Sequence, residues 1–219
     1  MTIDQNLLSI KSTVPEHVTL VAVSKTKPIS DLMQAYDVGQ RIFGENKIQE
    51  MAEKWDVMPK DIKWQMIGHV QTNKVKFMAS FVNLIHGVDS LKLLQEINKQ
   101  AKKNDRIIDC LLQMHIAEEE TKFGLNEEEL ASLLSSSEFH EMKNIKIVGL
   151  MGMATFTDNK AQIKKEFTHL KLIFDTIRSR DELQCFSTLS MGMSGDYKLA
   201  IDCGSTMIRL GSSIFGERN

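Results

Sequence analysis

The feature that most constrains the fold is a regular alternation of short apolar runs with stretches of helical spacing. Strands that alternate with helices pair in parallel, because parallel neighbours need crossover connections. Runs that are apolar throughout are typical of strands covered on both faces. Eight such runs occur, at 18–24, 41–45, 63–68, 83–89, 109–116, 146–154, 186–192 and 206–216. Eight strand–helix units in 219 residues predict an α/β fold, a closed (β/α)8 TIM barrel, with a doubly wound open sheet as the alternative.

The clearest helix is predicted over 160–178, where Ile163, Phe167, Leu170, Phe174 and Ile177 recur at steps of four and three and form one apolar stripe. We interpret that stripe as core packing. Polar residues suited to N-caps begin two more helices, Asp89 or Ser90 in one and Asn126 in the other. These further helices are expected at 89–103 and 125–134, and an additional N-terminal helix at 3–12.

The composition limits the kinds of binding partner and the cellular compartment that we expect for this chain. The chain has 27 basic and 29 acidic residues, with no block of like charge long enough to grip a nucleic-acid backbone or an anionic membrane. A small molecule or another protein is the expected partner. Cys110, Cys185 and Cys203 are widely spaced and read as free thiols of a reducing compartment. No signal peptide, membrane span or linker is evident, so we expect one cytoplasmic domain over residues 1–219.

Active sites of such barrels lie at the carboxyl ends of the strands, and the loops after the seventh and eighth strands often hold phosphate. The sequence places a glycine-bearing turn at each position, "SMGMSGD" at 190–196 and "RLGSS" at 209–213. The first turn leads into a short helix candidate, "YKLAIDCG", whose N-terminus near Ser194 would favour an anion. Either turn alone is weak evidence, but together they predict a phosphate cup.

In a closed barrel the eighth strand neighbours the first, so this cup would lie beside Lys25, which follows the run "TLVAVS". A primary amine next to an anion site suits imine formation with a phosphorylated aldehyde. Burial and the nearby Lys27 would both disfavour the ammonium form of Lys25. Lys27 is the weaker candidate because it directly precedes Pro28 and belongs to an extended exit from the strand. A solvated lysine at a strand end is the alternative for Lys25.

These residues carry a resemblance that spans almost the whole chain. The segments "AVSKTKP", "FGENKIQE", "GHVQTNK", "TKFG", "LSMGMSGD" and "GSTMIRLGSSIFGER" resemble, in order, the signature segments of the YggS/PROSC family of pyridoxal phosphate homeostasis proteins. One departure is the valine in "GHVQTNK", where leucine is expected; the change is conservative. The resemblance implies a barrel of the alanine racemase N-terminal domain type that carries pyridoxal 5′-phosphate.

The same resemblance implies roles for individual residues. Lys25 matches the Schiff-base lysine, and Arg209 matches the arginine that faces the pyridine nitrogen. Asn46 falls where the family places a side chain near the cofactor ring. The groups around the phosphate match Ser194, Gly211 and Ser212, with Met193 in the same turn.

Structural alternatives stand beside these roles. Arg209 could pair with a carboxylate such as Asp202 at the barrel rim, and Asn46 could cap the helix "KIQEMAEKW". Three histidines near strand ends lack compact metal spacing and are read as rim or core residues: His69, His86 and His115. No metal site is predicted. Lys122 in "TKFG" could take cofactor in transit or be a surface lysine.

The resemblance also bears on catalysis. An arginine opposite the pyridine nitrogen would keep that nitrogen unprotonated, which makes the ring a poor electron sink. Racemases of this fold add a tyrosine from a second domain, whereas this chain ends three residues after Gly216 and its tyrosines, Tyr36 and Tyr197, lie in helical segments. We therefore expect a monomeric carrier or buffer of pyridoxal phosphate that serves apo-enzymes and supports vitamin B6 and amino-acid balance without its own catalysis. The alternatives are a weak racemase, decarboxylase or transaminase, and a Schiff-base aldolase without pyridoxal phosphate.

Overall fold

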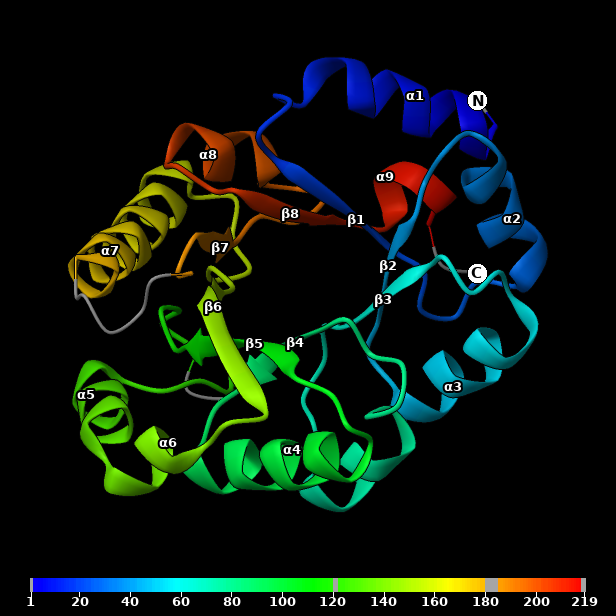
Figure 1. The fold of residues 1–219 in the computed structure, drawn as a ribbon. Helices are drawn as coiled ribbons and strands as arrows, with labels where there is room; N and C mark the ends of the chain where they lie inside the picture. Colours follow the sequence, from blue (N-terminus) through cyan, green and yellow to red (C-terminus); the bar gives the residue numbers. More distant parts are fainter. Residues whose placement is uncertain (1, 120–121, 180–184, 218–219) are drawn as a thin grey trace.

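Eight parallel strands close into a barrel in the order of the sequence, with β8 returning to pair with β1 (Figure 1). The computed structural model describes residues 2–119, 122–179 and 185–217. The strands are β1 (Thr19–Val23), β2 (Ile42–Glu45), β3 (Lys63–Met66), β4 (Leu84–Val88), β5 (Ile108–Met114), β6 (Ile145–Gly152), β7 (Thr188–Ser190) and β8 (Met207–Leu210). The closed barrel confirms the predicted fold class, and the open-sheet alternative is wrong.

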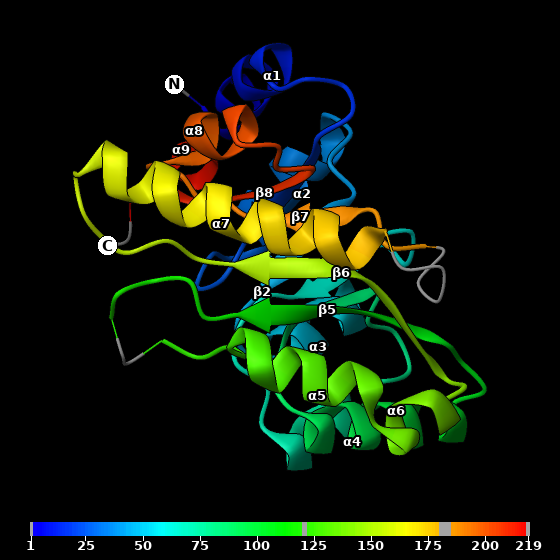
Figure 2. The same ribbon diagram turned by 90° about the vertical axis from the view of Figure 1, so that its left-hand side faces the viewer.

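Helices surround the barrel, and Figure 2 shows α7 and α5 lying along the outside of β6 and β5. The helices are α1 (Ile3–Thr13), α2 (Ile29–Asp37), α3 (Ile48–Val57), α4 (Leu91–Lys103), α5 (Glu127–Ser135), α6 (Ser137–Glu141), α7 (Lys160–Arg178), α8 (Tyr197–Asp202) and α9 (Ser212–Phe215), with a 3-10 turn, η1, at Thr72–Phe77. The predicted caps are confirmed, because the side chains of Ser90 and Asn126 accept from the N–H groups of Leu93 and Glu129. The additional N-terminal helix and the 160–178 helix are also present.

The predicted eighth strand, 206–216, is wrong in its second half. The strand ends at Leu210, and the amides of Ile214 and Phe215 then donate to the carbonyl of Gly211, which starts the short helix α9. Ile214 and Phe215 are buried, so the segment stays apolar although its backbone is helical. A short apolar run does not distinguish a buried strand from a buried helix, and this is why the pattern misplaced the boundary.

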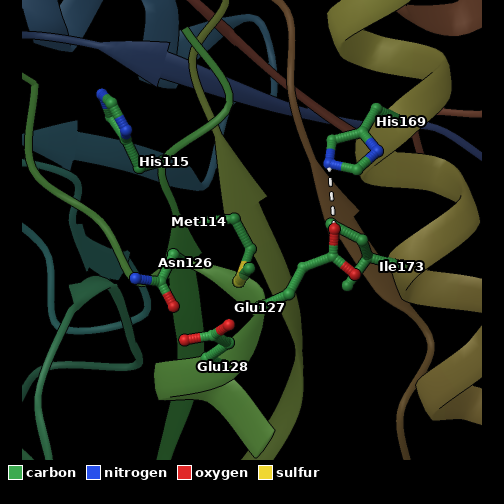
Figure 3. A pocket seen from close by; sticks show the side chains of 7 residues that line it. All are labelled: Met114, His115, Asn126, Glu127, Glu128, His169 and Ile173. Carbon is green, nitrogen blue, oxygen red and sulfur yellow. Dashed lines mark ion pairs between the residues drawn. The ribbon is translucent and has the colours of Figure 1, made fainter. Parts of the chain in front are cut away.

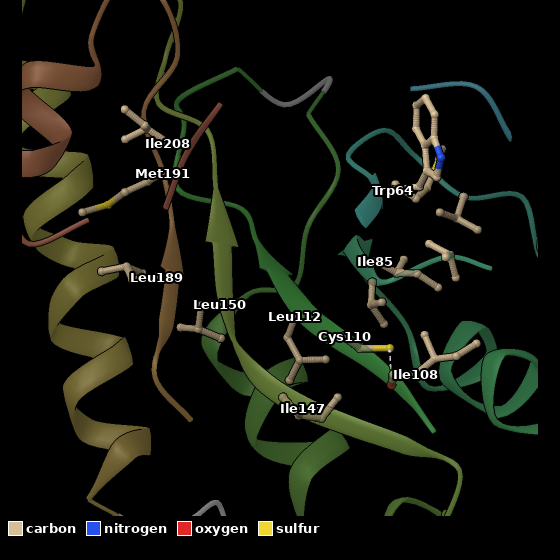
Figure 4. Close-up of a cluster of buried hydrophobic side chains, with 14 of the residues drawn as sticks. Trp64, Ile85, Ile108, Cys110, Leu112, Ile147, Leu150, Leu189, Met191 and Ile208 are labelled. Carbon is tan, nitrogen blue, oxygen red and sulfur yellow. Dashed lines mark hydrogen bonds between the residues drawn. The ribbon is translucent and has the colours of Figure 1, made fainter. Parts of the chain in front are cut away.

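Most of the apolar core lies between the strands and the surrounding helices (Figure 4). A smaller cluster packs separately against Ile67 and Met153, and its members are Val21, Leu84, Leu111, Met151 and Met207. Each comes from a different strand or its end, so the barrel interior is filled with side chains, as expected for eight strands. Ile67 and Met153 also line the cavity described below, so this cluster forms its floor.

Among the helices in the described part of the chain, none has the length and apolar character needed to cross a bilayer.

Candidate functional site

A cavity of about 810 Å³ opens at the carboxyl ends of the strands, where the barrel rule places an active site. Its walls come from β1, β8 and the loops after β2, β3, β5, β6 and β7. All seven residues that the sequence suggested for a cofactor line it: Lys25, Asn46, Met193, Ser194, Arg209, Gly211 and Ser212. The structure therefore brings the predicted residues together in one place.

Lys25 lies in a tight turn directly after β1. The amide of Lys27 donates to the carbonyl of Ser24 at 3.1 Å and closes the turn, which leaves Lys25 and Thr26 at its two central positions. Lys25 is half-buried on the cavity wall. The Lys27 ammonium points to the end of α9, where it donates to the carbonyls of Phe215 and Glu217 at 3.0 and 3.1 Å. The two lysines thus have different surroundings.

Arg209 is buried beneath the cavity, with 4% of its surface exposed. Its guanidinium donates to the carbonyl and hydroxyl of Ser190, at 2.9 and 2.5 Å, and to the carbonyl of Gly152 at 3.0 Å. Burial lowers the pKa of Arg209 to about 10, partly offset by the carboxylate of Asp196. The ion pairs among the described residues include none between Arg209 and Asp202, so that alternative is wrong.

A buried hydrogen-bonded chain crosses the barrel interior and ends at Arg209. His86 lies 2.7 Å from the Gln65 amide oxygen through Nε2, and 3.1 Å from the Ser190 hydroxyl through Nδ1. An amide oxygen only accepts, so Nε2 carries the proton and Nδ1 accepts from Ser190, whose oxygen accepts from Arg209. Burial and the guanidinium lower the pKa of His86 well below its ordinary value. His86 is therefore a neutral core histidine that helps hold Arg209.

The cup between the seventh and eighth strands differs in detail from the expectation. The hydroxyl of Ser194 accepts from the amides of Gly211 and Ser213 at 3.3 and 3.4 Å, so the start of α9 meets this side chain. The amides of Asp196 and Tyr197 instead donate to the Met193 carbonyl. These two amides are thus engaged internally, and an anion at the N-terminus of α8 near Ser194 stays a prediction.

Gly211 allows the cup to close against the first strand. A β-carbon at this position would lie 3.3 Å from the Val23 carbonyl oxygen and 3.4 Å from the Val23 side chain. In the adjoining turn, the carboxylate of Asp196 accepts from the Met193 amide at 2.6 Å, and burial raises the pKa of this carboxyl group. The backbone around the cup is therefore closely fixed.

Asn46 does not cap the helix that follows it. The N-cap of α3 is Lys47, which makes no side-chain cap bond, so the capping alternative is wrong. The Oδ1 atom of Asn46 is buried and has no hydrogen-bond partner in the described part of the chain. Gly68 lies against it: a β-carbon there would be 2.6 Å from the Asn46 carbonyl oxygen. Asn46 is thus held at the cavity wall with an unused acceptor.

Sequence reasoning missed Gln65 and Gln113, because polar residues inside strands give no motif, and it assigned no role to Ser190 at the start of "SMGMSGD". Gln113 lines the cavity and donates to the carbonyl of Phe123 at 2.8 Å. His69 is a rim residue, as predicted, stacked on Phe123 at 4.0 Å between ring centroids.

Lys122 also lies at the cavity rim. Its ammonium donates to the carbonyl of Ala154 at 2.6 Å and pairs with Glu119 at 2.8 Å.

A second hollow of about 370 Å³ lies between α5 and α7 (Figure 3). It contains His115 and an ion pair between His169 and Glu127, joined at 3.4 Å. Within the described residues, His, Cys, Asp and Glu form no group of three or more that could hold a metal ion. This hollow is distinct from the cavity that contains the predicted cofactor residues.

Comparison with known proteins agrees with the fold and with the motif resemblance. The family model for the alanine racemase N-terminal domain matches residues 1–219. Proteins named pyridoxal phosphate homeostasis protein are 36% identical in Aquifex aeolicus and 38% identical in Haemophilus influenzae, over 91% and 92% of this chain and 86% of each relative. Alanine racemase of Clostridium difficile shares the fold, with a TM-score of 0.78 over 60% of its chain, at only 15% identity.

Solved structures of PipY from Synechococcus elongatus PCC7942 are similar over 98% of this chain and 100% of PipY. The structure without PLP has a TM-score of 0.92 at 31% identity, and the structure with PLP bound has a TM-score of 0.89 at 30% identity. The chain therefore belongs to the YggS/PROSC family of pyridoxal phosphate homeostasis proteins, built on the alanine racemase N-terminal domain.

Proposed function

We propose that this protein binds pyridoxal 5′-phosphate as a Schiff base on Lys25, holds it, and hands it to apo-enzymes without catalysing a reaction of its own. The observation that carries the proposal is the single cavity wall on which Lys25, Arg209 and the Ser194–Gly211 cup meet. The PLP-bound structure of PipY supports the identity of the ligand. The single domain over residues 1–219, the monomeric state and the cytoplasmic location stay predictions.

The residues present fit this cofactor. The unused acceptor of Asn46 lies at the wall of the cavity that Lys25 and Arg209 also line. Ser194 and Ser212 line the cavity, and their hydroxyls offer polar contacts for a phosphate. The amides of Gly211 and Ser213 donate to the Ser194 hydroxyl and hold it at the start of α9. The loops after the seventh and eighth strands commonly hold phosphate in barrels of this kind.

When bound, the cofactor supplies a reactive aldehyde. The amine of Lys25 adds to the aldehyde carbon, a C=N bond replaces the C=O bond, and the aldehyde oxygen leaves as water. The reverse reaction with water releases the intact aldehyde, so the link suits holding and transfer. No oxidant or reductant is required.

The geometry argues against strong catalysis. Arg209 stays cationic at neutral pH, because its pKa of about 10 is still well above 7. A cation facing the pyridine nitrogen disfavours protonation of that nitrogen. In the described part of the chain neither tyrosine lines the cavity, and the Tyr36 hydroxyl is bonded to Asp61 at 2.9 Å. Neither Tyr36 nor Tyr197 is therefore placed to act as a second acid or base in the cavity.

A transfer experiment tests the carrier role. The loaded protein is mixed with an apo-enzyme that requires pyridoxal phosphate, and recovery of that enzyme's activity is compared with recovery from free cofactor released by dilution alone. We expect transfer from the loaded protein to be faster than release by dilution. Equal rates would contradict a hand-over role, and saturable turnover of a small amino acid that is abolished in Lys25→Ala would indicate an enzyme instead.

A further inference from the structure

A buried ionic network lies directly behind the turn that carries Lys25. Lys54, on α3, is 6% exposed, and Glu45, at the end of β2, is fully buried. The Lys54 ammonium donates to Glu45 Oε1 at 2.7 Å, to Glu50 Oε1 at 2.7 Å and to the carbonyl of Ser24 at 2.8 Å. An ammonium has three N–H donors, so all three are used. Lys54, Glu45 and Glu50 do not line the cavity.

The network holds the turn on both sides of Lys25. Before it, the Ser24 carbonyl accepts from Lys54, and the Ser24 hydroxyl donates to Glu45 Oε1 at 2.6 Å. After it, the amide of Thr26 donates to Glu50 Oε1 at 2.6 Å. Lys25 itself lies between these two anchoring points.

The backbone at Thr26 explains why such anchoring is needed. Thr26 has φ of +65°, a left-handed conformation that β-branched residues rarely adopt. It occupies the third position of the Ser24–Lys27 turn, where positive φ normally calls for glycine or asparagine. A residue stays in such a conformation only when surrounding contacts impose it, and these conformations gather at functional sites. The Glu50 carboxylate supplies that contact.

Burying charged groups costs free energy unless the charges are paired and their remaining polar atoms are hydrogen-bonded. Burial raises the pKa of Glu45, although Lys54 and Ser24 act against that rise, and Glu45 Oε2 is buried without a hydrogen-bond partner among the described residues. The network is thus incompletely paired and costs free energy, and it lies at the Ser24–Lys27 turn that carries the Lys25 amine. A purely apolar contact between α3 and the barrel would hold the helix without this cost.

We propose that Lys54 and Glu50, supported by Glu45, are positioning residues that fix the Ser24–Lys27 turn so that the Lys25 amine meets an aldehyde held in the cavity. The inference rests on the proposed function, because it assigns these residues a role only through Lys25. A small displacement of a reacting group lowers reaction rates steeply, so loss of this anchoring should slow the formation of the C=N bond.

The test separates imine formation from ligand binding. The rate of imine formation with pyridoxal 5′-phosphate is followed by absorbance in apo-protein, and the site is mapped after borohydride reduction. Affinity for pyridoxamine 5′-phosphate, which has the ring and phosphate but no aldehyde, is measured in parallel with the thermal midpoint. A general loosening of the cavity would lower both the rate of imine formation and the affinity for pyridoxamine 5′-phosphate. A misplaced amine would lower only the rate of imine formation.

Glu50 is the main test position because its side chain is partly exposed and the variants should fold. We expect Glu50→Ala to slow imine formation roughly tenfold, the equivalent of one lost charge-assisted hydrogen bond, with pyridoxamine phosphate affinity within about twofold of wild type. Glu50→Gln keeps an oxygen acceptor for the Thr26 amide and should restore most of the rate. Lys54→Met should slow the reaction, and Lys54→Arg should not restore it, because a planar fork cannot reproduce three divergent donors.

The matched control is Lys171→Met, which removes another i,i+4 lysine–carboxylate pair, with Asp175 on α7, away from the cavity wall. It should leave the rate and the affinity unchanged. Wild-type rates in Glu50→Ala and in Lys54→Met, or equal losses of rate and affinity in Glu50→Ala, would overturn the positioning role. Failure of the proposed function itself is recognised separately, by an imine that persists in Lys25→Ala.

Discussion

At the residue scale, Arg209 lines the cavity but is held in place by side chains that do not line it. Arg209 is held through Ser190 to His86 and Gln65, a chain that spans β8, β7, β4 and β3. Each member has a defined donor or acceptor role, so the chain is satisfied as long as His86 stays neutral. Protonation of His86 would place a second cation near a buried guanidinium.

This arrangement predicts a pH dependence of stability. The pKa of His86 is lowered in the folded state, so the unfolded chain binds that proton more readily below about pH 6.5. The contribution of neutral His86 is present above that pH and is lost as the pH falls towards the folded-state value. In urea unfolding, wild type should lose more free energy of unfolding between about pH 7.5 and about pH 5 than His86→Gln, which cannot titrate.

Other titratable groups, including the carboxyl groups of Glu45 and Asp196, whose pKa values burial raises, are common to both proteins and cancel in the comparison. An equal loss in the two proteins would show that His86 does not contribute.

At the scale of elements, the cup formed by Ser194 and the start of α9 is packed against a helix that lies outside the barrel repeat. The α1 helix packs on α9 and α2, and the Asn6 side chain donates to the carbonyl of Ile214 at 3.1 Å (Figure 1). The amides at the start of α9 meet Ser194, so α1 supports the cup from behind. We therefore expect the additional N-terminal helix to contribute to binding of the cofactor phosphate in the proposed function.

Removing that support should weaken the cup. Asn6→Ala is expected to lower the free energy of unfolding by about 1 kcal/mol, the usual worth of one hydrogen bond, and to weaken pyridoxamine 5′-phosphate binding several-fold. Isothermal titration and urea unfolding measure the two effects. The control is Asn104→Ala, which removes a similar bond to the Gln100 carbonyl at the end of α4. If both variants bind equally well, α1 does not support the cup.

The elements also show what the sequence could predict. The apolar stripe over 160–178 predicted both boundaries of α7, because a long amphipathic pattern leaves little freedom, and the Asn159 cap emerges only in the structure. The eighth apolar run failed at Gly211, where burial continues but the backbone becomes helical. The cap proposed for Asn46 failed because its residue type suits both a helix cap and a polar position on a cavity wall, and only the tertiary packing against Gly68 decides between them.

At the scale of the whole molecule, the barrel follows from the repeat, and the cavity follows from closure of the barrel. Closure places β8 beside β1, with Val21 opposite Arg209 in the register, so Lys25 and the cup converge although they are far apart in sequence. The motifs indicated the residues that line the cavity. The segment "FGENKIQE" contains Glu45 and Glu50, but nothing in it indicated their network with Lys54, because all three are ordinary surface-type residues until α3 folds against the barrel.

The most direct measurement is the absorption spectrum of the protein loaded with pyridoxal 5′-phosphate, compared with that of Lys25→Ala, before and after borohydride reduction and peptide mapping. We expect an imine band that maps to Lys25 and is lost in the variant. Lys27→Ala is the matched control, since Lys27 lines the same cavity but its ammonium bonds to the end of α9, and its band should remain. A protein that forms no imine with added cofactor, or a Lys25→Ala variant that keeps the band, would contradict the account.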